Sequence, residues 1–121
     1  MRFDQVIWIC EGATGCAAGL SLGLGVIGRP SCSGGTLELL VALPRLKARH
    51  CVIIADSDND REFGGKIINP GLDGAQRLAD VIGIPCCMVI LPCKDIREFV
   101  RIGGTAQDLE DIVKSSVWKV H

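Results

Sequence analysis

Short apolar runs alternate with amphipathic stretches along this chain. The runs cover residues 5–10, 24–27, 51–55 and 86–91. Short apolar runs bounded by turn residues are typical of strands that are buried on both faces of a parallel sheet. The pattern therefore predicts four strands in the interior of the fold.

Each predicted strand is followed by at least one stretch with helical character. The helices are expected at 13–22, 36–47, 72–82, 95–102 and 106–114, and a long polar loop is expected at 56–70. Alternating strands and helices are typical of a parallel sheet with helices on its faces. The predicted fold class is α/β, with a small parallel sheet of about four strands sandwiched by helices.

The helical periodicity also predicts which side of each helix faces the core. In the helix at 36–47, the apolar face is assigned to Leu37, Leu40, Val41 and Leu43. In the helix at 72–82, the corresponding face is assigned to Leu72, Ala75, Leu78, Ala79 and Ile82. Thr105 is expected to cap the last helix.

The length and composition fit one domain spanning residues 1–121. Hydrophobic residues make up 48% of the chain and charged residues 22%, which excludes a disordered or coiled-coil protein. The net charge of −1 is not that of a free-standing nucleic-acid binder. Any contact with nucleic acid must then come from a local patch or a partner domain. The chain has no Tyr, which excludes a tyrosine nucleophile of its own.

The seven cysteines indicate a reduced, cytoplasmic protein. No two of them have the CxxC spacing of a zinc site, and most lie in apolar runs, where cysteine acts as a small hydrophobe. Cys32 and Cys93 are the best candidates for reactive thiols. No membrane partner is expected, because the longest uncharged stretch, 12–28, is shorter than the ~20 residues of a spanning helix. In that stretch Gly15 and Gly19 would let a helix lie close to the sheet.

Acidic residues follow three of the four predicted strands. Ligands of open α/β sheets bind beyond the carboxyl ends of the strands, and Glu11, Asp56 and Asp58 occupy such positions. If the first and third strands are neighbours, these carboxylates share one place, and a hard divalent cation relieves their repulsion. Oxygen ligands favour Mg²⁺, with Mn²⁺ as a substitute, and Asp60 is a further candidate ligand. The implied chemistry is phosphoryl transfer or phosphodiester hydrolysis.

Plainer interpretations exist for the same residues. An acidic run such as 56–60 is also typical of a solvated turn, and Glu11 can serve as a cap beside a helix N-terminus. The loop at 29–35 has backbone N–H groups and the hydroxyls of Ser31 and Ser33, which can hold a phosphate. A simple connection between a strand and a helix explains that loop equally well.

These residues together resemble the Toprim family, the domain shared by topoisomerases, bacterial-type primases and some nucleases and recombination proteins. The resemblance lies in a buried strand that ends in Glu11-Gly12 and a later strand that ends in Asp56-x-Asp58. It extends to 71–79 and to 92–98, which resembles the closing motif of the primase-type domains of phages, plasmids and mobile elements. It spans roughly Val6 to Val113.

The resemblance implies roles for individual residues. Glu11 would act as general acid or base, and Asp56 and Asp58 would bind Mg²⁺. Lys94 or Arg29 would steady the phosphate charge. The residues expected to contact nucleotide or nucleic acid are Gly12, Arg29, Ser31, Ser33, Lys94 and Asp95. Many primase-type members carry an acid where this chain has Gly15, a departure that weakens a second metal site.

The leading functional interpretation is the catalytic, metal-binding Toprim domain of a DNA primase-like nucleotidyltransferase. Its partners would be nucleic acid, nucleoside triphosphates and other domains or subunits of a replication protein. One alternative is a small stand-alone Toprim nuclease that cleaves RNA or DNA with the same acids. Another is a non-catalytic Toprim module for assembly and DNA binding.

Overall fold

The fold is built on a five-stranded sheet. The structure, a computed structural model, describes residues 6–29, 34–55, 61–68, 70–91, 93, 95–116 and 118–119. Four strands are parallel and a short fifth strand runs antiparallel at one edge. In spatial order they are β2 (Val26–Arg29), β1 (Val6–Glu11), β3 (His50–Ala55), β6 (Cys86–Ile90) and β7 (Trp118–Lys119).

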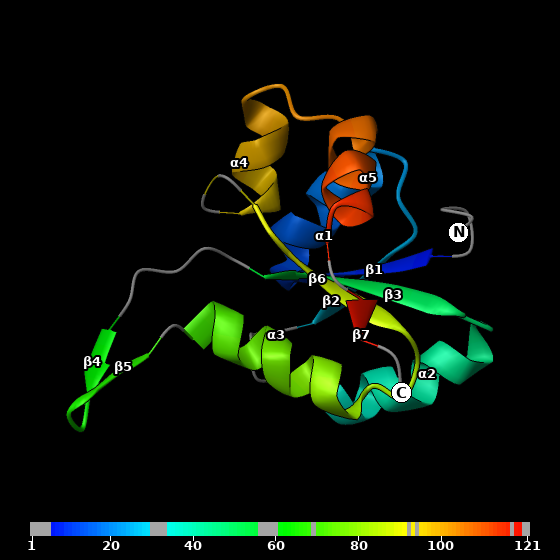
Figure 1. The fold of residues 1–121 in the computed structure, drawn as a ribbon. Helices are drawn as coiled ribbons and strands as arrows, with labels where there is room; N and C mark the ends of the chain where they lie inside the picture. Colours follow the sequence, from blue (N-terminus) through cyan, green and yellow to red (C-terminus); the bar gives the residue numbers. More distant parts are fainter. Residues whose placement is uncertain are drawn as a thin grey trace.

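Helices cover both faces of the sheet (Figure 1). One face carries α1 (Gly12–Ser21), α4 (Ile96–Arg101) and α5 (Ala106–Lys114). The other face carries α2 (Thr36–Arg45) and α3 (Pro70–Val81). The predicted α/β class, with about four parallel strands between helices, is confirmed.

The side chains of each central strand alternate between two cores. Trp8 and Val52 point into the core under α1, α4 and α5, whereas Ile9 and Ile53 point into the core under α2 and α3. All four are at most 1% exposed. Burial on both faces explains why β1 and β3 are continuous apolar runs with no polar positions between.

Helix α1 lies close to β2 because it is lined with small residues. A Cβ atom added to Gly19 would lie 2.7 Å from Cγ2 of Val26, so no larger residue fits there without movement. Gly15 is also buried, but a Cβ there would lie at ordinary contact distances from Ile96 and Cys10. The predicted use of these glycines for close packing is thus confirmed most clearly at Gly19.

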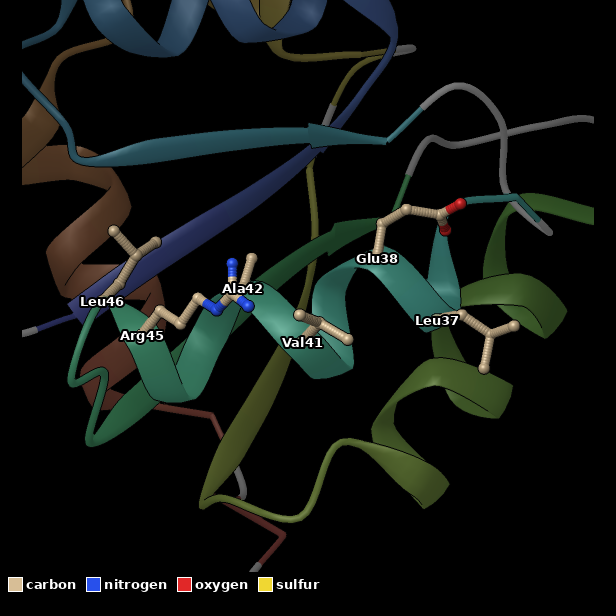
Figure 2. A pocket seen from close by; sticks show the side chains of 6 residues that line it. All are labelled: Leu37, Glu38, Val41, Ala42, Arg45 and Leu46. Atoms are coloured by element: carbon tan, nitrogen blue, oxygen red, sulfur yellow. The ribbon is translucent and has the colours of Figure 1, made fainter.

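The apolar face assigned to α2 is partly wrong. Leu39 and Leu43 are the buried residues of this helix, and each is 2% exposed. Leu37 and Val41 instead lie on the outer side, where they line a shallow groove together with Leu46 (Figure 2). Periodicity failed here because α2 carries apolar residues on more than one side. For α3, burial of Ala75, Leu78, Ala79 and Ile82 confirms the assigned face, and nothing is described of the Leu72 side chain.

Part of the predicted loop at 56–70 is a β-hairpin. Strands β4 (Arg61–Phe63) and β5 (Lys66–Ile68) pair antiparallel and lie apart from the layers of the main sheet (Figure 1). The turn is Gly64-Gly65, with φ of 59° and 81°. A two-residue hairpin turn of this kind requires positive φ at both positions, which glycine adopts without strain. The Gly64-Gly65 pair is therefore the feature of this polar stretch that indicates a β-hairpin.

Strand β7 was also not predicted. It pairs only Trp118 and Lys119 with β6, which is too short for a periodic signal. The Trp118 ring packs at the edge of the core and meets the His50 ring in a T-shaped arrangement, with 5.6 Å between ring centroids. Trp118 thus contributes to packing at the last strand of the sheet.

The last helix begins with the expected cap. The Thr105 hydroxyl accepts a hydrogen bond from the Asp108 backbone N–H at 3.2 Å, and the Asp108 carboxylate accepts one from the Thr105 N–H at 2.9 Å. This capping box satisfies two backbone donors of the first turn.

Four cysteines are core residues, as their apolar surroundings predicted. Cys10, Cys51, Cys86 and Cys87 are at most 1% exposed, and burial is the largest cause that raises the pKa of the Cys51 and Cys87 thiols. Cys32 lies outside the described residues. No helix of the described residues has the length and apolar character needed to cross a membrane.

The contacts of α1 predict opposite outcomes for two alanine substitutions. Gly19→Ala should lower the free energy of unfolding by about 1–3 kcal/mol, because the new methyl group overpacks against Val26. Gly15→Ala should be neutral or stabilising by up to about 1 kcal/mol, because alanine is the better helix former and its methyl group fits. Urea unfolding of both variants tests this. Equal effects would contradict the close approach of α1 to β2.

Candidate functional site

The carboxyl ends of β1 and β3 lie side by side. The two strands are parallel neighbours, and Ile9 is the register partner of Ile53. Both strands end two residues later, at Glu11 and Ala55. Asp56 follows Ala55 directly in the sequence. The first and third predicted strands are therefore neighbours, which is the condition for their acids to share one edge of the sheet.

Glu11 is placed where a capping residue would be, but its side chain does not cap. It is the last residue of β1 and the N-cap of α1, and its carboxylate accepts no hydrogen bond from that helix. The side chain is half-buried and has no polar partner within the described part of the chain. Glu11 thus occupies the expected place beside the helix N-terminus without the side-chain hydrogen bond of an ordinary cap.

Gly12 makes the sharp turn from β1 into α1. Its φ is +73°, in the left-handed region that residues with a Cβ adopt only at a cost. No atom would touch an added Cβ, so the requirement for glycine is conformational and not one of space. The turn holds Glu11 at the mouth of the sheet while α1 folds back over one face.

Arg29 is the neighbour of Glu11 across the sheet. It ends β2, and its register partner on β1 is Glu11. The residue is only 5% exposed, and its Nε–H donates a hydrogen bond to the Gly34 carbonyl oxygen at 3.0 Å. Arg29 therefore ties together the two ends of the loop that contains Ser31 and Ser33. Sequence reasoning missed the Gly34 contact, which depends on how that loop closes.

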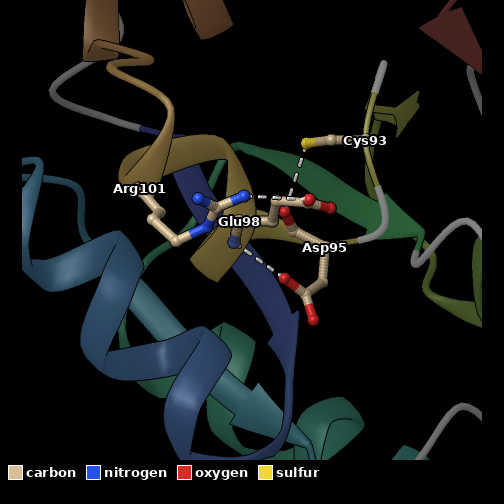
Figure 3. A network of polar contacts seen from close by, with 4 residues as sticks. All are labelled: Cys93, Asp95, Glu98 and Arg101. Atoms are coloured by element: carbon tan, nitrogen blue, oxygen red, sulfur yellow. Dashed lines mark hydrogen bonds and ion pairs between the residues drawn. The ribbon is translucent and has the colours of Figure 1, made fainter.

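Asp95 has a structural task at the start of α4. Its Oδ1 accepts a hydrogen bond from the Glu98 backbone N–H at 2.9 Å, as expected of an N-cap (Figure 3). Glu98 in turn forms an exposed ion pair with Arg101 at 3.3 Å. The sequence predicts that Asp95 contacts nucleotide or nucleic acid. In the structure, one of its carboxylate oxygens is already engaged as the cap of α4.

Cys93 belongs to the same network, and its surroundings disfavour the thiolate. Its thiol donates a hydrogen bond to the Asp95 carbonyl oxygen at 3.4 Å (Figure 3). Desolvation and then the negative charge of Glu98 raise the pKa of Cys93, a backbone hydrogen bond of Asp95 lowers it by a smaller amount, and the negative charge of Asp95 adds the smallest increase. Because only the thiolate reacts readily, these surroundings oppose the reactivity predicted for Cys93.

Gly15 lies on the side of α1 that is buried against α4 and β1. A Cβ added there would lie 3.5 Å from Cγ2 of Ile96 and 3.6 Å from Cβ of Cys10. A carboxylate there would be desolvated among apolar groups at a cost of several kcal/mol. Position 15 therefore supplies no metal ligand in this packing.

The remaining predicted site residues lie outside the described residues. These are Ser31, Ser33, Asp56, Asp58, Asp60 and Lys94. Among the residues that are described, no three histidine, cysteine or acidic side chains come together in a way that could hold a metal. The described part of the site thus consists of Glu11, Gly12 and Arg29 at one edge of the sheet, with Asp95 at the start of α4.

Comparison with known proteins gives a likeness in structure alone. No protein-family model matches the chain, and no curated protein matches it in sequence. A solved structure described as the DnaG catalytic core superposes with a TM-score of 0.69 and 15% sequence identity. The match covers 94% of this chain and 35% of that chain. The match shows that this chain has the fold of part of the DnaG catalytic core.

Arg29 is predicted to be a structural residue of the site. Arg29→Gln should lower the free energy of unfolding by about 1–3 kcal/mol, because the half-buried Gly34 carbonyl loses a charged donor. Arg97→Gln on the exposed surface of α4 serves as the control and should change stability by less than about 0.5 kcal/mol. Chemical unfolding measures both. Equal small effects would contradict the bracing role.

The surroundings of Cys93 predict slow alkylation at neutral pH. Site-resolved mass spectrometry should show iodoacetamide reacting more slowly there than with the same cysteine in an unfolded peptide, because a raised pKa leaves less thiolate. Glu98→Gln should speed the reaction at neutral pH by removing a negative charge near the sulfur. Glu110→Gln on α5 is the matched control. If Glu98→Gln and the control behave alike, Glu98 does not influence the thiol.

Proposed function

We propose that this chain is the Toprim domain of a primase-like DNA replication protein and that it carries out Mg²⁺-dependent phosphoryl transfer on nucleic acid. One observation carries the proposal. The fold matches the DnaG catalytic core over 94% of this chain, and it places Glu11 at the carboxyl end of β1 beside β3, the strand that precedes Asp56-x-Asp58.

The residues at this edge fit a magnesium ion. Glu11 offers a half-buried carboxylate without a polar partner among the described residues. Asp56 and Asp58 follow the neighbouring strand, and with Asp60 they complete a set of oxygen donors, which Mg²⁺ prefers. When bound, the metal would neutralise phosphate charge and polarise the reacting oxygens.

The chain's own residues have separate tasks in this proposal. Glu11 accepts or donates a proton at its carboxylate as general acid or base. The first turn of α1 has no acidic side chain and no side-chain cap, so its backbone N–H groups, next to Gly12, favour a nearby phosphate. Arg29 holds the loop in which Ser31 and Ser33 would contact nucleotide. Lys94 would add positive charge near the phosphate, next to Asp95.

Other polypeptide is expected to take part in the reaction. The match covers only 35% of the DnaG catalytic core, so most of that structure lies outside the part that resembles this chain. The net charge of −1 also gives this chain little attraction of its own for nucleic acid. We therefore propose nucleic acid, nucleoside triphosphates and other domains or subunits of a replication protein as partners.

A metal titration tests the proposal. The wild-type chain should bind Mn²⁺ and Mg²⁺, and Glu11→Gln and Asp58→Asn should each weaken binding by at least about tenfold, because a direct ligand is lost. Glu110→Gln and Asp111→Asn on α5 are matched controls that should bind as the wild type does. Calorimetry measures affinity, and circular dichroism verifies that the variants remain folded.

The products of the reaction distinguish the alternatives. New oligonucleotides made on a single-stranded template support the primase-like function, whereas a shortened substrate indicates a nuclease. Wild-type protein that binds single-stranded DNA but no divalent cation, even with the DNA present, would contradict a catalytic role. That result would leave a Toprim module for assembly and DNA binding.

A further inference from the structure

Helix α2 has a second apolar side that its own chain does not cover. Leu39 and Leu43 fill the core, yet Leu37, Val41 and Leu46 are 75%, 55% and 55% exposed. These three side chains line the groove of Figure 2. Several large apolar side chains exposed along one helix are typical of an interaction surface.

The residues of this groove form a palindrome. Its centre lies between Val41 and Ala42. Glu38 and Arg45 are equally far from this centre on either side, and so are Leu37 and Leu46. The six lining residues are Leu37, Glu38, Val41, Ala42, Arg45 and Leu46. Positions seven apart lie on the same side of an α-helix, about two turns from one another. The pattern therefore reads the same in either direction, except that the charges are opposite.

A pattern of this kind is complementary to itself. If two α2 helices pack antiparallel about a two-fold axis between Val41 and Ala42, each Glu38 meets Arg45 of the second copy. Leu37 and Leu46 are nine positions apart, so they lie on opposite sides of the helix and flank this contact. Glu38 and Arg45 form no ion pair within the described part of their own chain, although both are exposed. A two-fold symmetric interface requires that the residues at such paired positions complement each other, whereas binding to an unrelated partner does not require it.

The apolar side of α2 continues to an open edge of the sheet. A second groove, between α2 and β2, is lined by Ile27, Gly28 and Gly35 and shares Glu38 and Ala42 with the first. Strand β2 is the last strand of the sheet on this side. A second copy seated on α2 would therefore also shield part of the edge strand, which is otherwise prone to unwanted pairing.

We propose that this chain forms a two-fold symmetric dimer in which α2 packs antiparallel against α2 of a second copy. The contact is centred on Val41 and Ala42, with an ion pair between Glu38 and Arg45 on either side of this centre. The surface is small, so a dissociation constant on the order of 10–100 μM is expected. The proposal does not depend on the metal site or on catalysis.

Two valines of similar exposure provide a matched test. Val41 on α2 is 55% exposed and Val81 on α3 is 52% exposed. Sedimentation equilibrium of the full chain should show a monomer–dimer equilibrium. Val41→Lys should raise the dissociation constant by at least about tenfold, because it buries a charge in an apolar contact. Val81→Lys should leave it unchanged, and circular dichroism verifies that both variants fold.

Charge reversal tests the antiparallel arrangement. Glu38→Arg and Arg45→Glu should each weaken the dimer by about fivefold or more, because each puts like charges together at two symmetry-related places. The double variant restores the opposite charges and should recover the wild-type affinity.

Three results would overturn the proposal. The first is a wild-type chain that stays monomeric at concentrations well above the expected dissociation constant, as it would if another polypeptide covers α2. The second is a dimer that Val41→Lys and Val81→Lys affect equally. The third is a double charge variant that dimerises no better than the single variants.

Discussion

Ile9, Cys10, Val52 and Ile53 are the central residues of β1 and β3, and none is more than 1% exposed. Their burial on both faces of the sheet requires helices above and below, and it leaves no room for polar side chains along the strands. Polar chemistry is thereby confined to the strand ends. The carboxyl ends of these two strands adjoin, so Glu11 and Ala55 lie at one edge.

The same edge shows how the chain separates structural tasks from binding tasks. Gly12 makes the turn, Arg29 braces the adjacent loop and Asp95 caps α4. Glu11 has none of these tasks, although it occupies an N-cap position. Its carboxylate is half-buried and has no polar partner among the described residues, which makes Glu11 the strongest candidate in the described site.

The sequence is sufficient to predict those site positions that follow from the order of strands and helices along the chain. Alternating strands and helices, with an acid after the first strand, are enough to predict Glu11 at the carboxyl edge of the sheet. The roles of Arg29 and Asp95 could not be predicted in the same way. A cap or a brace depends on the distance between one side chain and one backbone group, and that distance is set by how a loop closes.

Local pattern by itself determined the four parallel strands, the helices, the α/β class and the capped start of α5, because each depends on residues near one another in the chain. The tertiary structure decided which side of α2 is buried. Leu37, Leu39, Val41 and Leu43 are all apolar, and only packing against the sheet selected Leu39 and Leu43. A helix with apolar residues on several sides has no preferred face until a neighbour covers one of them.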